Sequence, residues 1–106
     1  MSIDLVTHPS GADAVAYGFS RPTVDDVRTT VYRVYTGGAQ GAWTELLQRA
    51  GLTGQENDSA AVERLVATAA ASDDPVMVMC GQAHAIRLAT HRRLVAVRDL
   101  VTAAAA

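Results

Sequence analysis

The sequence predicts an all-α protein, folded as a compact bundle of four to five helices that ends in a long C-terminal helix. Two observations support this prediction. Apolar residues recur at intervals of three and four positions over several stretches of the chain, which places them on one face of a helix. The ends of these stretches carry residues that start or stop helices, namely Thr or Asp before the first turn, Pro inside it and Gly behind the last turn. For 106 residues we expect a single domain over 1–106.

The N-terminal residues predict no long element. A turn cluster at His8–Gly11 interrupts the segment, and residues 12–17 are expected to form a short helix. Residues 29–36 combine β-branched and aromatic types that are typical of strands, so strand and helix both stay open there. Helix is favoured, because a lone strand would have no partner elsewhere in the chain.

A first long helix is expected to begin near Val24. Thr23 and Asp26 have the spacing of a capping box, in which each side chain accepts a hydrogen bond from the backbone of the other residue. The predicted apolar face consists of Val24, Val27, Val31 and Val34. The glycine pair Gly37 and Gly38 should end this helix.

Two further helices are expected in the middle of the chain. The first covers residues 39–50, ends before Gly51, and has the apolar face Trp43, Leu46, Leu47 and Ala50. The second is capped by Asp58 or Ser59 and has the apolar face Val62, Leu65, Val66 and Ala69.

The last helix has a strong start signal. Pro75 suits the first turn, and Asp73 and Asp74 just before it complement the positive end of the helix dipole. The run from Val76 to about Thr102 then fits one helix of roughly 26 residues, near 40 Å long at about 1.5 Å per residue.

The apolar positions of this last helix drift around its axis. They are Val76, Met79, Ala83, Ile86, Thr90, Leu94, Val97 and Val101. Two successive four-residue steps around Thr90 predict a bend or break there. Residues 103–106 should fray, and a short buried strand over residues 76–80 stays open as an alternative.

The composition indicates a soluble protein of the cytoplasm. Hydrophobic residues make up 49% and charged residues 19% of the chain, and no apolar stretch approaches the roughly 20 residues that a membrane helix needs. Asp4 stands where a secretory signal would carry basic residues, and Cys80 has no second cysteine to pair with. The absence of lysine and the abundance of alanine indicate a bacterial genome rich in GC.

Charge is distributed unevenly along the chain. Residues 1–75 contain five arginines and ten acidic residues, whereas residues 76–106 contain four arginines and one acidic residue, Asp99. Opposite charges in the two parts attract each other within one molecule or between two antiparallel copies. We therefore expect a homodimer, with nucleic acid and membrane as unfavoured partners.

Three residues of the last helix are candidate metal or haem ligands. Cys80, His84 and His91 project from roughly one side of a continuous helix. No fourth ligand or cysteine pair has a matching spacing, so we expect a buried cysteine beside two histidines at the edge of the core, and no cofactor. A strand over residues 76–80 would instead place Cys80 at a strand-to-helix junction, where a nucleophile can be activated, but the other strands of such a sheet are missing from the pattern.

Candidate partner-binding residues fall into an aromatic and a basic group. They are Tyr35 and Trp43, and Arg87, Arg92, Arg93 and Arg98. A ligand pocket or hot spot uses aromatic side chains of this kind, although core packing explains Trp43 as well, because it lies on the apolar face of its helix. The basic side chains are more often a solvated helix face than a contact to nucleic acid.

The sequence contains no recognisable catalytic set, so we expect a small non-enzymatic interaction or adaptor protein that self-associates. The alternative is a DNA-binding transcriptional regulator that uses a helix-turn-helix-like segment over residues 24–50. Its would-be recognition helix lies in the acidic part of the chain and carries Glu45, which opposes phosphate contact. The third interpretation is the metal- or haem-binding helical protein.

Overall fold

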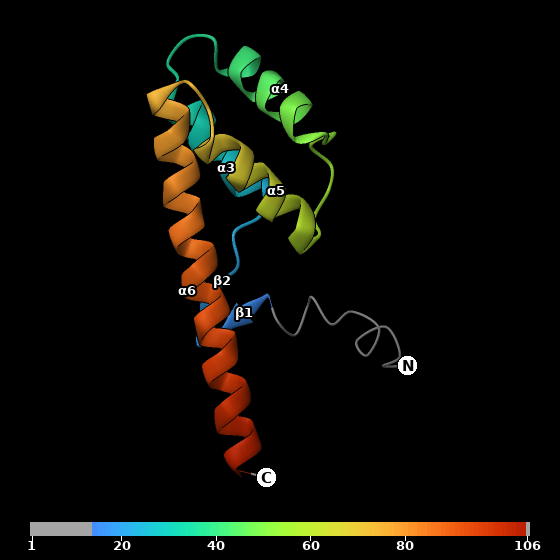
Figure 1. The fold of residues 1–106 in the computed structure, drawn as a ribbon, viewed down its shortest axis with the longest axis vertical. Helices are drawn as coiled ribbons and strands as arrows, with labels where there is room; N and C mark the ends of the chain where they lie inside the picture. The colour runs from blue at the N-terminus through green and yellow to red at the C-terminus, as the bar shows by residue number, and fades with distance from the viewer. Residues whose placement is uncertain (1–13, 106) are drawn as a thin grey trace. The chain divides into compact units, whose positions relative to one another are not determined.

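The computed structural model describes residues 14–105 and confirms the all-α fold with a long C-terminal helix (Figure 1). Over these residues the chain forms four helices and one small β-hairpin. The elements are β1 (Val15–Ala16), β2 (Phe19–Ser20), α3 (Val24–Val34), α4 (Ala39–Ala50), α5 (Ser59–Ala70) and α6 (Pro75–Ala105). The turn cluster expected at His8–Gly11 lies outside the described residues.

The described chain divides into two compact units. Residues 22–86 form the larger unit, which contains α3, α4, α5 and the first part of α6. Residues 14–21 and 87–105 form the smaller unit, which contains the hairpin and the rest of α6. The single domain expected over residues 1–106 stays a prediction.

The hairpin of the smaller unit replaces the short helix expected over residues 12–17. That prediction is wrong for residues 14–17, while residues 12 and 13 lie outside the described part. Val15 pairs with Ser20 and Ala16 with Phe19 in antiparallel register. The two loop residues, Tyr17 and Gly18, both have positive φ, at 51° and 76°, as a type I′ hairpin turn requires. Glycine adopts this conformation readily, but tyrosine rarely does, so the sequence signal for this turn is weak.

Helix α3 begins at the capping box that the sequence predicts. The Thr23 hydroxyl accepts a hydrogen bond from the Asp26 backbone at 3.1 Å, and the Asp26 carboxylate accepts one from the Thr23 backbone at 2.9 Å. Of the four valines expected on its apolar face, Val34 is 44% exposed and the other three are buried. Residues 29–34 are helical, and residues 35 and 36, which precede the glycine pair, form neither helix nor strand, so the strand alternative for residues 29–36 is wrong.

Helix α4 has the predicted bounds, and α5 begins behind its predicted cap at Asp58. Gly51 adopts the left-handed conformation behind α4, and the next residue, Leu52, donates its backbone N–H to the Leu47 carbonyl at 2.9 Å. Asp58 caps α5 by accepting a hydrogen bond from the Ala61 backbone at 3.2 Å. The residues buried from the two predicted faces are Trp43, Leu46, Ala50, Val62, Leu65, Val66 and Ala69, whereas Leu47 is half-buried.

A glycine allows α5 and α6 to approach closely within the larger unit. A Cβ atom added at Gly81 would lie 2.3 Å from the backbone nitrogen of Ala70 and 2.8 Å from the carbonyl carbon of Ala69. Real Cβ atoms do not approach backbone atoms to this distance, so only glycine fits here. The apolar spacing of the last helix gives no indication of this role of Gly81.

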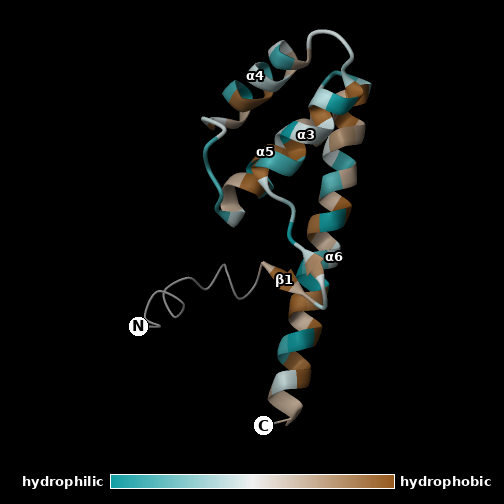
Figure 2. Ribbon diagram, turned by 180° about the vertical axis from the view of Figure 1, so that it is seen from behind, coloured by the Kyte–Doolittle hydropathy of each residue, from teal (hydrophilic) through white to brown (hydrophobic). Residues whose placement is uncertain are grey.

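Helix α6 is longer and more regular than the sequence predicts. It spans 31 residues, continues through Thr90 without a break, and includes residues 76–80, so the strand alternative for that segment is wrong. Residues 103–105, which were expected to fray, are helical, while residue 106 lies outside the described part. Hydrophobic residues recur along the whole of α6 in Figure 2. With apolar residues on several sides of the helix, the spacing alone does not identify its buried face.

Candidate functional site

The cysteine and the two histidines of α6 all lie on its buried side. Cys80 is 3% exposed, His84 6% and His91 5%. Among residues 14–105, no three His, Cys, Asp or Glu side chains form a group that could hold a metal ion. The burial of all three side chains supports the packing interpretation.

His84 is tied to α3 inside the larger unit. Its Nε2 atom lies 2.9 Å from the hydroxyl of Thr30, and the same hydroxyl donates to the Asp26 carbonyl at 3.1 Å. A hydroxyl has a single hydrogen, so Nε2–H of His84 donates to Thr30 in this arrangement. The imidazole thus has a structural task, which is to join two helices that are 54 positions apart in sequence.

Cys80 and His91 show different consequences of burial. Burial and the nearby carboxylate of Asp74 raise the pKa of the Cys80 thiol, which opposes formation of a nucleophilic thiolate. His91 belongs to the smaller unit, and its Nε2 atom is buried without a hydrogen-bond partner among the described residues. An unpaired buried polar atom destabilises the fold.

The segment from α3 to α4 has the outline of a helix-turn-helix, but the exposed residues of α4 do not favour DNA. The two helices pack together across a short connection that includes Gly37 and Gly38. On α4, Arg49 forms an ion pair with Glu45 at 3.0 Å, so its charge is already matched by a carboxylate. Trp43 is buried and therefore belongs to the core of the larger unit.

The basic residues of α6 lie in the smaller unit and have different surroundings. The guanidinium of Arg87 stacks over the Phe19 ring, with 5.4 Å between its central carbon and the ring centroid. Arg98 forms an ion pair with Asp99 at 3.1 Å, and Arg92 also has an interaction partner. Arg93 is exposed. These residues do not form a cluster of free cations.

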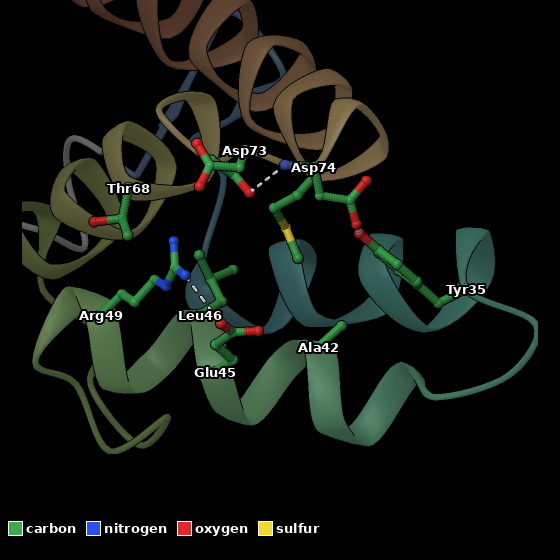
Figure 3. A pocket seen from close by; sticks show the side chains of 10 residues that line it. Tyr35, Ala42, Glu45, Leu46, Arg49, Thr68, Asp73 and Asp74 are labelled. Atoms are coloured by element: carbon green, nitrogen blue, oxygen red, sulfur yellow. Dashed lines mark hydrogen bonds and ion pairs between the residues drawn. The ribbon is translucent and has the colours of Figure 1, made fainter.

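A pocket opens in the larger unit, where α3 and α5 end and α6 begins (Figure 3). Its volume is about 200 Å³. Of the two aromatic residues that the sequence indicates for a ligand pocket, Tyr35 lines this one and Trp43 does not. The charged and phenolic lining residues are Tyr35, Glu45, Arg49, Asp73 and Asp74, and Leu46 and Met77 add apolar surface. This volume is below the roughly 300 to 1,000 Å³ of most small-molecule sites.

Tyr35 and Asp74 form a hydrogen bond at the edge of this pocket, with the tyrosine hydroxyl as donor. Burial, followed by the hydrogen bond to Asp74, raises the pKa of Tyr35 to about 12. The hydrogen bond from Tyr35, followed by one from the Val76 backbone, lowers the pKa of Asp74. Tyr35 therefore stays protonated and Asp74 ionised at neutral pH, which suits neither residue to general acid–base catalysis.

Large apolar side chains remain exposed along α6. In the larger unit, Val76 is 40% exposed, Met79 69% and Ile86 68%. In the smaller unit, the exposed apolar residues with their fractional exposures are Val97 (47%), Leu100 (71%) and Val101 (56%). These residues largely coincide with the apolar positions that the sequence places on the last helix. Exposed apolar surface of this kind is typical of interaction sites.

The chain matches no protein family model, no curated protein and no solved structure. Within residues 14–105, no helix is both long and apolar enough to cross a membrane.

Proposed function

We propose that the protein is a small non-enzymatic interaction protein that self-associates through the end of α6. The observation that carries this proposal is the exposure of residues 92–105, called the C-terminal segment from here on. The segment is helical throughout, yet none of its residues is buried. Its large apolar residues are Leu94, Val95, Val97, Leu100 and Val101.

A helix without buried residues depends on intrinsic helix propensity and on the rest of its own helix for stability. Most helical stability in proteins comes from packing of an apolar face, and isolated helices shorter than about 12 to 15 residues are marginal in water. Packing against a second protein surface would supply the burial that the C-terminal segment lacks. It would also remove the exposed apolar side chains from water, at about 25 cal/mol per Å².

A second copy of the same helix fits this surface. Leu94, Val97, Val101 and Ala104 follow the three-four-three spacing of a coiled-coil seam, and none of them is charged. Two identical seams can therefore meet without burying a charge. The next two seam positions toward the N-terminus are Thr90, which is half-buried, and Arg87, which stacks on Phe19, so the apolar seam begins at Leu94. The single cysteine, free and buried, supports a cytoplasmic location as part of the proposal.

The test is the molar mass of the purified protein by size-exclusion chromatography with light scattering. We expect a dimer for the wild type at micromolar concentration and a monomer for Val97→Asp, which places a charge in the seam. Ala96→Asp is the matched control, because Ala96 is exposed on the same turn but lies off the seam. This variant should remain dimeric.

A monomeric wild type would contradict the proposal, and so would a Val97→Asp variant that stays dimeric. Circular dichroism of both variants shows whether their helix content is preserved. A loss of dimer in Val97→Asp then reports on the surface rather than on the fold.

DNA binding is the second candidate function, supported by the helix–turn–helix outline of α3 and α4. The ion pair between Glu45 and Arg49 weighs against it, because α4 then offers little free positive charge to a phosphate backbone. Fluorescence anisotropy with a labelled DNA duplex tests this alternative. Binding that weakens steeply with salt would favour a regulator, whereas no binding at low salt would exclude this role.

A further inference from the structure

We infer that two copies of the C-terminal segment pair in antiparallel orientation. This inference rests on the proposed self-association and adds the direction of the second helix. In heptad notation, Leu94 and Val101 occupy a positions and Val97 and Ala104 occupy d positions of the seam. The residues that flank the seam on its two sides then decide how the helices align.

The flanking residues of the C-terminal segment are mostly basic or apolar. Arg93 and Leu100 occupy the g positions on one side, and Arg98 and Ala105 occupy the e positions on the other. No acidic residue stands at a flanking position, since Asp99 lies on the side of the helix away from the seam. Charges at e and g positions set the orientation of paired helices.

Parallel pairing would bring like charges together. In a parallel pair, each g residue faces the e residue five positions farther along the other helix, so Arg93 of one copy would face Arg98 of the second copy. By symmetry this contact would occur twice, with no acidic flanking residue to compensate it. Leu100 would face Ala105, which leaves much of its side chain in water.

Antiparallel pairing removes this conflict. In that orientation g residues face g residues, so Leu100 meets Leu100 of the second copy and the most exposed apolar side chain of the segment becomes buried. Along the seam, Leu94 packs beside Ala104 and Val97 beside Val101 of the second copy. The one remaining like-charge approach is between the two Arg98 residues, which is one contact instead of the two of the parallel pair. The ion pair of Arg98 with Asp99 at 3.1 Å is the same in both orientations.

Disulfide cross-linking distinguishes the two orientations. Leu94→Cys and Ala104→Cys are made separately in a Cys80→Ala background, which removes the native thiol, and the two proteins are then mixed and oxidised. In the antiparallel pair, position 94 lies beside position 104 of the second copy. Two copies of position 94 lie about ten residues apart along the axis, about 15 Å. A disulfide needs Cα atoms within about 7 Å.

The expected result is a disulfide between the two variants in the mixture and little cross-linking of either variant alone. Cross-linking of each variant with itself, without the mixed product, would overturn the inference and show parallel pairing. A dimer that gives none of these products would also overturn it, because the copies would then meet through another surface. These outcomes all presuppose a dimer, whereas a monomeric wild type in light scattering contradicts the proposed function itself.

A charge variant provides a second readout. Arg98→Glu would turn the two Arg93–Arg98 contacts of a parallel pair into attractive ones, so cross-linking of like positions should increase in this background. An unchanged product pattern would contradict the role assigned to the flanking arginines.

Discussion

The two parts of α6 are equally helical but differ in packing. In the larger unit, the first part of the helix buries Met77, Cys80, Gly81 and His84. In the smaller unit, the helix buries Leu88 and His91 and then no further residue up to its end. The comparison shows that the helix extends beyond the residues that the chain itself buries, because burial depends on which other elements are present to cover it.

The largest effect of a substitution on stability is expected where the first part of α6 contacts α5. Gly81→Ala forces a Cβ atom into the backbone of α5, which cannot move aside as a flexible side chain does. We expect a loss of unfolding free energy of about 3 kcal/mol, the upper end for overpacking. The loss would be measured as a lower urea midpoint by circular dichroism.

Gly41→Ala is the control for this prediction. Gly41 lies in α4 with no atom within 4 Å of an added Cβ, so alanine should raise the stability by up to about 1 kcal/mol through its higher helix propensity. Equal effects of the two substitutions would show that α5 and α6 do not pack closely at Gly81.

The two buried histidines give a second, smaller contrast between the parts of α6. His84→Leu removes the hydrogen bond to Thr30 and should lower the unfolding free energy by about 1 kcal/mol. His91→Leu removes a buried nitrogen that has no hydrogen-bond partner among the described residues, so it should leave the stability unchanged or raise it. Urea unfolding of the two variants at pH 7 tests the difference. A destabilised His91→Leu would mean that the imidazole makes a favourable interaction in the smaller unit.

The helix boundaries could be predicted from the sequence because they depend on local chemistry. The capping box at Thr23, the aspartate cap at Asp58 and the left-handed Gly51 each involve residues within a few positions of one another. The hairpin at Tyr17 was missed, because a type I′ turn with tyrosine at its first loop position lacks the usual Asn-Gly or Asp-Gly signal.

Long-range packing could not be predicted from the pattern. The small or polar residues Cys80, Gly81 and His84 are buried, whereas the more hydrophobic Met79 and Ile86 are exposed. Gly81 faces α5 because the helices approach closely, and the spacing of apolar residues carries no signal for such an approach. The pocket combines Tyr35 with residues of α4, α5, α6 and the segment between α5 and α6, and the apolar spacing of the sequence does not indicate that these residues lie together.

The smallest effect is a pH dependence of stability, expected at the start of α6, where Tyr35 donates a hydrogen bond to Asp74. The pKa of Tyr35 is raised to about 12 in the folded chain. The unfolded chain therefore loses this proton near the usual pKa of 10.0, and the folded chain loses it only at higher pH. The stabilisation from this phenol is therefore complete below pH 10 and is lost as the pH rises toward 12. In an absorbance titration of tyrosinate, the signal of one residue should appear only near pH 12, and this late signal should be absent in Tyr35→Phe. Asp74→Asn should move this signal to lower pH, although not to the usual value, because burial contributes more to the shift than the hydrogen bond does. An unchanged titration in Asp74→Asn would show that Asp74 does not hold the phenol, and that α3 is not anchored to the start of α6 through this contact.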